Sequence, residues 1–159
     1  MSVESRIVYF DKPGWRCTDE VLEGLRIVVV TAHTGYARAN LQSFPEARRR
    51  ELTAKGVPVL TAPHVFGGLS YAMRDLYGTA MLGVDMGNAL RTLGQGMKVV
   101  IECPMAAMDA GLLTPGEEVI SMGGTNRGVD TAVTLRPVHV KDFFSLRVNE
   151  ILCKPRFDP

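Results

Sequence analysis

The sequence predicts an α/β fold with a mostly parallel sheet and an antiparallel edge, and three observations support this prediction. Short β-branched and apolar runs alternate along the chain with helical patterns, which is typical of βαβ units. Residues 25–30 and 97–101 are apolar runs of the kind found in strands buried on both faces of a parallel sheet. The last two expected strands are joined without a clear helix, which favours an antiparallel edge. We expect a single domain over residues 1–159, with a sizeable core.

The expected elements follow from composition and from turn signals. Strands are expected where β-branched or aromatic residues cluster between turn residues, namely at 6–10, 25–30, 57–60, 97–101, 117–122, 132–135 and 146–152. Helices are expected where apolar residues recur at three- and four-residue spacing, namely at 45–55, 69–77, 86–93 and 105–110. A further helix begins near Thr18, with acids in its first turn, but meets Gly24 almost at once. That is very short for a capped helix.

Bulk composition excludes several classes of protein. Hydrophobic residues make up 46% of the chain and the formal net charge is +1, which argues against disorder and against a nucleic-acid binder held by bulk charge. No apolar stretch approaches the length of a membrane span, and the first residues lack a signal region, so we expect a cytoplasmic protein. The three cysteines are scattered, which makes a disulfide framework unlikely. Cys153 lies in an apolar run and is expected to be buried.

The stretch from residue 123 to residue 131 is the most distinctive loop, and it lies between two expected strands. Glycines allow a backbone to approach a ligand closely, and successive N–H groups can form an anion-binding concavity. Arg127 would add a bidentate clamp, and Asp130 would fix the loop by accepting backbone N–H bonds. One interpretation is therefore an oxyanion-binding loop; the other is a wide hairpin whose glycines serve only the turn. The candidate binding residues here are Gly123, Gly124, Thr125, Asn126, Arg127, Gly128, Asp130 and Thr131.

Polar residues also follow two expected parallel strands. The candidates after residues 25–30 are Thr31, His33, Thr34 and Gly35, and His64 follows residues 57–60. Ligands of open α/β sheets bind beyond the carboxyl ends of the strands, so His33 and His64 are expected to face one crevice if their strands are neighbours. An imidazole there would donate to a phosphate or act as a general acid. The alternative is a pair of histidines satisfied by local backbone groups.

Glu102 and Cys103 follow the expected strand at 97–101. Glu102 is a candidate base or ligand for a hydroxyl group, and Cys103 would have a lowered pKa if it began the following helix. The favoured alternative is that Glu102 caps this helix and Cys103 is packed. The three histidines have no Glu or Cys at ligand spacing, so no metal site is expected. The candidate catalytic residues are thus His33, His64 and Glu102.

Four segments together carry a resemblance to a known family. They are IVYFDKPG at 7–14, VVVTAHTG at 28–35, GGTNRGVDTA at 123–132 and LRPVH at 135–139. Through them the chain resembles, nearly end to end, small archaeal and bacterial proteins of uncharacterised function whose fold is similar to the C-terminal α/β domain of pyruvate kinase. The resemblance implies a three-layer α/β/α sandwich and flavin mononucleotide (FMN) as an associated cofactor. It also implies that the 123–131 loop and the turn at 33–35 lie at the ligand edge of the sheet.

The chain departs from this family at one place. Between Glu23 and Leu25 the family carries a further helix–strand–helix unit of about 30 residues, the size of a βαβ crossover, whereas here there is only Gly24. The unit would hold a central strand and a loop that resembles a phosphate cradle, so its loss puts flavin binding in question. It would also leave residues 28–30 without cover, which predicts a homo-oligomer.

Three functions are consistent with these observations. The first is a binding domain for a small phosphate-bearing molecule, with FMN as the leading candidate. The second is a structural, oligomeric relic of the family with an incomplete site. The third is an enzyme acting on a small phosphorylated or carboxylated metabolite, for which no nucleophile, base and orienting group can be named together.

Overall fold

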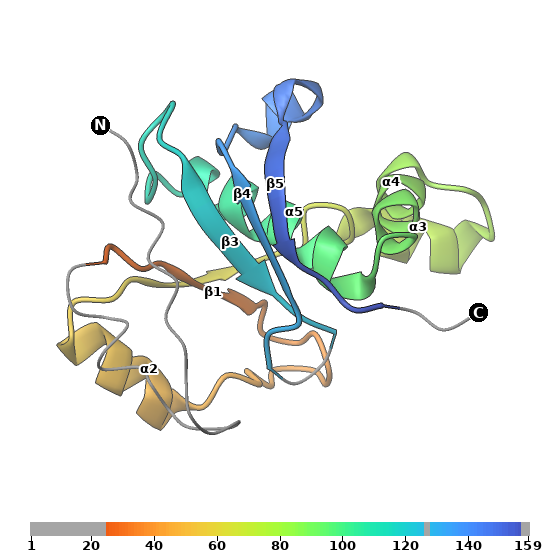
Figure 1. The fold of residues 1–159 in the computed structure, drawn as a ribbon. Helices are drawn as coiled ribbons and strands as arrows, with labels where there is room; N and C mark the ends of the chain where they lie inside the picture. The colour runs from red at the N-terminus through yellow and green to blue at the C-terminus, as the bar shows by residue number, and fades with distance from the viewer. Residues whose placement is uncertain (1–24, 126–127, 157–159) are drawn as a thin grey trace.

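The computed structural model describes residues 25–125 and 128–156, and these residues have mixed α/β architecture (Figure 1). Expected elements at residues 6–10 and near Thr18 lie outside the described residues. The described elements, in chain order, are β1 (Val29–Ala32), α2 (Glu46–Ala54), β2 (Val59–Ala62), α3 (Leu69–Tyr77), α4 (Leu82–Arg91), α5 (Gln95–Asp109), β3 (Val119–Gly123), β4 (Thr131–Leu135), the 3₁₀ helix η1 (Val140–Ser145) and β5 (Val148–Cys153). None of the helices in this part of the chain combines the length and apolar character needed to cross a bilayer.

The described strands form two small sheets. β1 and β2 pair in parallel, with Val29 opposite Val59 and Ala32 opposite Ala62. β3, β4 and β5 form an antiparallel sheet in that order. The expected α/β class is therefore confirmed, and seven of the elements expected from residue 45 onwards have the expected type, at positions within a few residues: α2, β2, α3, α4, β3, β4 and β5. The helix expected at 105–110 forms the end of α5, and β1 begins later than expected and includes Thr31.

The expected strand at residues 97–101 is wrong. These residues belong to α5, a 15-residue helix that continues through Pro104 to Asp109. A short apolar run cannot be assigned to strand or helix from periodicity alone. Here Met97, Ile101 and Met105 recur every four residues and are all nearly buried, which is the period of a helix face. The sequence interpretation thus counted one parallel strand too many, and this is one reason why the described strands do not form a single, mostly parallel sheet.

α5 lies behind the antiparallel sheet and forms the core with it (Figure 1). Val100 and Met105 of α5 pack with Val133 and Leu135 of β4, and all four have 0% exposure. Gly123 makes the approach of helix and strand possible, because a Cβ atom at this position would lie 2.8 Å from Cγ1 of Val99. The core thus fixes α5 against the strands, and α5 carries several of the side chains described below.

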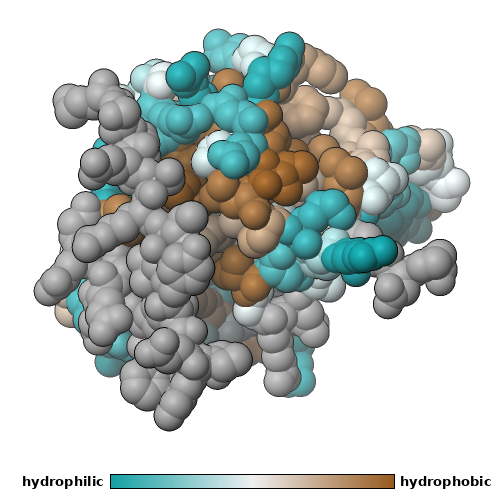
Figure 2. Space-filling view, viewed as in Figure 1, coloured by the Kyte–Doolittle hydropathy of each residue, from teal (hydrophilic) through white to brown (hydrophobic). Residues whose placement is uncertain are grey.

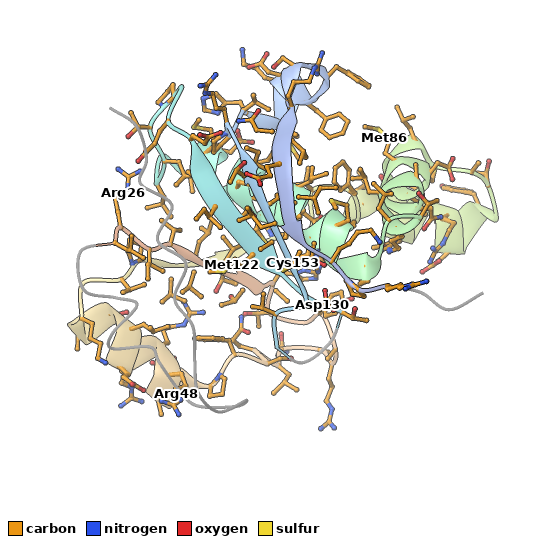
Figure 3. The ribbon with its side chains drawn as sticks, viewed as in Figure 1. Arg26, Arg48, Met86, Met122, Asp130 and Cys153 are labelled. Carbon is orange, nitrogen blue, oxygen red and sulfur yellow. The ribbon has the colours of Figure 1, made fainter. Side chains whose placement is uncertain are left out.

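The opposite face of the antiparallel sheet is apolar and open. Ile120 and Met122 alternate with buried residues along β3 and are 50% and 58% exposed. Met122 pairs with Ala132, which pairs with Cys153, so the three residues form one row across the sheet (Figure 3). Figure 2 shows hydrophobic side chains gathered over this sheet. The expectation that Cys153 is buried is wrong, because β5 is an outer strand of the sheet and the thiol is exposed.

Candidate functional site

Two parallel strands bring the histidines together. β1 and β2 are paired in register up to Ala32 and Ala62, so both strands end at the same level. His33 follows β1 directly and His64 follows β2 by two residues. Their ring centroids are 5.7 Å apart, and the ring of Tyr36 lies 5.6 Å from His33 and 4.8 Å from His64. The expectation that His33 and His64 face one crevice is therefore confirmed.

This crevice, which we call the histidine crevice, has a volume of about 420 Å³. The first turns of α3 and the end of that helix supply its other wall. Arg74 donates to Asp75 at 2.6 Å and lies 4.9 Å over the ring of Tyr71. The hydroxyl of Tyr71 in turn accepts a bond of 3.0 Å from Arg91. The residues that line the histidine crevice are His33, Tyr36, His64, Gly68, Tyr71, Arg74 and Asp75.

Behind His64 lies a buried ion pair on α5. Lys98 and Glu102 are one helical turn apart, form a direct salt bridge, and are only 2% and 4% exposed. Nδ1 of His64 lies 3.0 Å from Oε2 of Glu102, and the Phe66 N–H donates to Oε1 at 3.1 Å. The sequence predicted that Glu102 follows a strand and caps the next helix. Both parts of this prediction are wrong. Glu102 stands in the middle of α5 and orients His64.

Sequence reasoning named Glu102 and His64 but missed Lys98. A signal for it existed, since Lys98 and Glu102 are four residues apart in an otherwise apolar stretch, and such a pair faces the same side of a helix. The assignment of residues 97–101 to a strand hid this spacing. A buried ion pair that reaches into a crevice through a histidine is the kind of arrangement found at functional sites.

The ionisation of Glu102 follows from these contacts. Burial acts to raise the pKa of this carboxyl group. The hydrogen bonds from His64 and Lys98, the charge of Lys98 and the Phe66 N–H act in the opposite direction and outweigh burial, so the pKa lies below its ordinary value. Glu102 is therefore a carboxylate at neutral pH, which can only accept hydrogen bonds.

Two ring nitrogens at the histidine crevice lack a hydrogen-bond partner among the described residues. They are Nδ1 of His33 and Nε2 of His64, and both atoms are buried. Buried polar atoms in native proteins are nearly always paired, because an unpaired one loses its hydration without compensation. Both atoms belong to rings that line the histidine crevice.

In the described part of the 123–131 loop, several donors are bound within the loop itself. The Asp130 carboxylate accepts bonds of 2.9 Å from the Thr125 N–H, 2.7 Å from the Thr125 hydroxyl and 2.7 Å from the Thr131 hydroxyl. The expectation that Asp130 fixes the loop through a backbone N–H is confirmed. Gly124 passes so close to the Gly128 carbonyl that a Cβ atom would lie 2.1 Å from its oxygen. Asn126 and Arg127 lie outside the described residues.

The remaining candidates around β1 have local roles. The hydroxyl of Thr31 lies 3.0 Å from that of Thr61 and 3.3 Å from the Leu60 carbonyl, so it links the two parallel strands. Thr34 is exposed in the turn, and Gly35 donates its N–H to the Leu41 carbonyl at 2.9 Å with φ of +91°. Of the candidates in this turn, His33 is thus the residue that lines the histidine crevice.

Cys103 is not an activated nucleophile. It lies within α5 rather than at the start of a helix, so the expected N-terminal activation is missing. Burial and, to a smaller extent, the negative charge of Glu102 raise the pKa of the thiol to about 11, although Lys98 acts in the opposite direction. The thiol is therefore protonated at neutral pH, and the alternative that Cys103 is a packing residue is the better description.

Within residues 25–125 and 128–156, no three His, Cys, Asp or Glu side chains are grouped as ligands of a metal ion. No model of a known protein family matches the chain. The chemistry of the histidine crevice is thus the main basis for a functional proposal.

Proposed function

We propose that this protein binds a small phosphate-bearing molecule in the histidine crevice, with FMN as the leading candidate. The observation that carries the proposal is the pair of buried, unpartnered nitrogens on His33 and His64. A bound polar molecule would supply the partners that the described chain does not. The crevice volume of about 420 Å³ falls within the range of known small-molecule sites.

Other features of the crevice support a ligand with an anionic group and a flat ring. Arg74 lines the crevice and would contribute a charge-assisted hydrogen bond to a phosphate, in exchange for its present bond of 2.6 Å to Asp75. No contact of the described structure fixes the tautomer of His33, so its Nδ1 is free to carry a proton and donate to the same group. Tyr36 and Tyr71 offer aromatic faces for stacking against a flavin ring.

The resemblance implies that the 123–131 loop lies at the ligand edge of the sheet, so this loop is the second candidate for the phosphate site. Arg127 would be its cation. Against it stands the Asp130 carboxylate, which already takes up the Thr125 N–H and the Thr125 and Thr131 hydroxyls, so these donors are not available to a phosphate. We therefore place the phosphate at the histidine crevice and use Arg127 to test the alternative.

Calorimetric titration with FMN and with inorganic phosphate tests the proposal. We expect FMN to bind, and the Arg74→Ala and His33→Ala variants to bind it about tenfold more weakly, as for the loss of one charge-assisted hydrogen bond. Arg127→Ala is the matched control and is expected to bind like the wild type. If Arg127→Ala alone has a lower affinity for FMN, the phosphate binds at the 123–131 loop and not in the histidine crevice.

If the protein is instead a structural relic with an incomplete site, no binding of FMN is expected. In that case the purified protein is colourless, and neither FMN, phosphate nor nucleotides shift its melting temperature. This result would overturn the binding proposal. A yellow protein whose co-purifying molecule has the mass of FMN would support it directly.

We also propose a more specific fold and an oligomeric state for this protein. The described elements support mixed α/β character alone, and a three-layer sandwich similar to the C-terminal domain of pyruvate kinase is a proposal that rests on the resemblance. A second copy of the chain would cover the open sheet face around Ile120 and Met122. Residues 28–30 are only half-buried, and β1 pairs with β2 alone among the described strands. Exposed apolar surface of this kind is typical of interfaces between subunits.

We therefore expect the protein to be a homo-oligomer. Light scattering coupled to size-exclusion chromatography should give a mass that is a multiple of 17.4 kDa at micromolar concentration. Met122→Lys places a charge on the sheet face and should shift the population towards the monomer, while Arg48→Ala on α2 should not. A well-folded wild-type monomer at this concentration would contradict the expectation.

A further inference from the structure

We propose that Glu102 makes His64 a hydrogen-bond acceptor, so that the ligand of the histidine crevice carries a hydroxyl group as well as a phosphate. This inference rests on the proposed function and makes it more specific. It concerns the positioning of protons in the buried network formed by His64, Lys98 and Glu102.

The first step is the proton between His64 and Glu102. Oε2 of Glu102 lies 3.0 Å from Nδ1 of His64, and an ionised carboxylate only accepts, so the proton of this bond belongs to Nδ1. The Lys98 ammonium also only donates, and its Nζ lies farther from Nδ1, at 3.4 Å. The shorter contact to Glu102 therefore determines the tautomer, which is assigned here from the hydrogen-bond network.

The second step is the state of the opposite nitrogen. A neutral imidazole carries one N–H, so a proton on Nδ1 leaves Nε2 as an acceptor. Nε2 of His64 is buried and has no partner among the described residues. A phosphate dianion has no proton to give and would not satisfy this atom. A hydroxyl group of the ligand would.

The third step is the division of roles within the crevice. His33 lies beside His64, with 5.7 Å between the ring centroids, and Arg74 lines the same crevice. The phosphate would accept from His33 and Arg74, and a hydroxyl would donate to His64. The ligand class that meets both requirements is a phosphate monoester of a polyol or sugar alcohol.

Two phosphate monoesters test this inference by calorimetric titration at pH 8. Glycerol 3-phosphate carries hydroxyls and propyl phosphate does not. We expect the wild type to bind glycerol 3-phosphate about tenfold more tightly, the value of one buried hydrogen bond. Glu102→Gln, whose amide can either donate or accept, should reduce this preference, and Arg48→Ala should leave it unchanged. Equal affinity of the wild type for both monoesters would overturn the inference but not the proposed function.

Nitrogen NMR of the His64 ring provides a readout that does not depend on a ligand. We expect the Nδ1–H tautomer in the wild type and a mixture of tautomers in Glu102→Gln. An Nε2–H tautomer in the wild type would overturn the inference whatever the titrations show. If neither monoester, FMN nor phosphate binds, the proposed function falls, and the hydroxyl-bearing ligand falls with it.

Discussion

Replacing Lys98 by methionine is expected to lower the free energy of unfolding by about 3–5 kcal/mol, the range for breaking one partner of a buried ion pair. Methionine keeps an unbranched side chain, one heavy atom shorter than that of lysine, and removes the charge. Glu102, which is 4% exposed, would keep the bonds from His64 and from the Phe66 N–H but lose its counter-charge. Urea denaturation followed by circular dichroism measures the difference.

Two variants show whether the charge is the cause. Lys98→Met combined with Glu102→Leu removes both charges and should recover most of the lost stability, since a buried pair can often be replaced by apolar residues. Arg48→Met breaks an exposed pair with Glu51 and should change stability by less than about 1 kcal/mol. A Lys98→Met variant as stable as the wild type would show that Glu102 does not depend on this cation.

Acid should affect the wild type and Lys98→Met differently. In the wild type the pKa of Glu102 is lowered by folding, so its contribution is present above the unfolded pKa and is lost as the pH falls through the folded pKa. Without Lys98, two of the effects that lower this pKa are lost, so the pKa of Glu102 is higher in the folded variant than in the folded wild type. Protonation of Glu102 therefore costs the variant less stability than it costs the wild type. The gap in stability between the two proteins should therefore narrow as the solution becomes acidic.

The convergence of His33 and His64 could be predicted because it depends on local rules. Each histidine follows an apolar run that is typical of a parallel strand, and parallel strands end at a common edge. The sequence alone does not show that β1 and β2 are neighbours. The predicted crevice depended on this pairing, which the structure supplies. Tyr36 and Arg74 join the crevice only through the loop after β1 and the packing of α3, which have no signal of comparable strength.

The buried network could not be predicted, because it depends on one element that periodicity left ambiguous. Met97, Val100 and Ile101 fit a helix face, and the β-branched residues among them also fit a strand. Tertiary contacts decide between the two, since α5 is covered by β3 and β4 on one side and by α4 on another. With residues 97–101 in a strand, Glu102 would fall at the strand end, too far from Lys98 for an ion pair.

The 123–131 loop shows how a glycine-rich stretch can support two interpretations. Asp130 accepts the donors of Thr125 and Thr131, so much of the loop's polarity is used internally. Its glycines relieve contacts with the rest of the protein, as at Gly123 beside Val99. The wide-hairpin interpretation therefore accounts for the described part of the loop, and the oxyanion interpretation now rests mainly on Arg127.

Replacing Gly96 by alanine is expected to destabilise the protein by about 1–3 kcal/mol, as for an overpacked core. Gly96 lies in the first turn of α5, directly against the start of β4. A Cβ atom at this position would lie 2.1 Å from Oγ1 of Thr131 and 2.4 Å from Oδ1 of Asp130. Thr131 has 0% exposure and its own Cβ atom would lie only 2.7 Å away, so it cannot turn aside.

Gly87→Ala is the matched control, because it also places a methyl group on a buried helical glycine. The nearest atom to a Cβ at Gly87 is Cβ of Phe66 at 3.4 Å, which is an ordinary contact. Alanine favours the helix over glycine by up to about 1 kcal/mol, so this variant should be neutral or more stable. The same preference acts at Gly96, and a loss there must therefore come from the contact with Thr131 and Asp130. If both variants were equally stable in urea denaturation, α5 and the 123–131 loop would not be as tightly packed as the structure indicates. If Gly96→Ala alone has a lower free energy of unfolding, the 123–131 loop is held in place by α5. This is the same helix that positions His64 through Glu102.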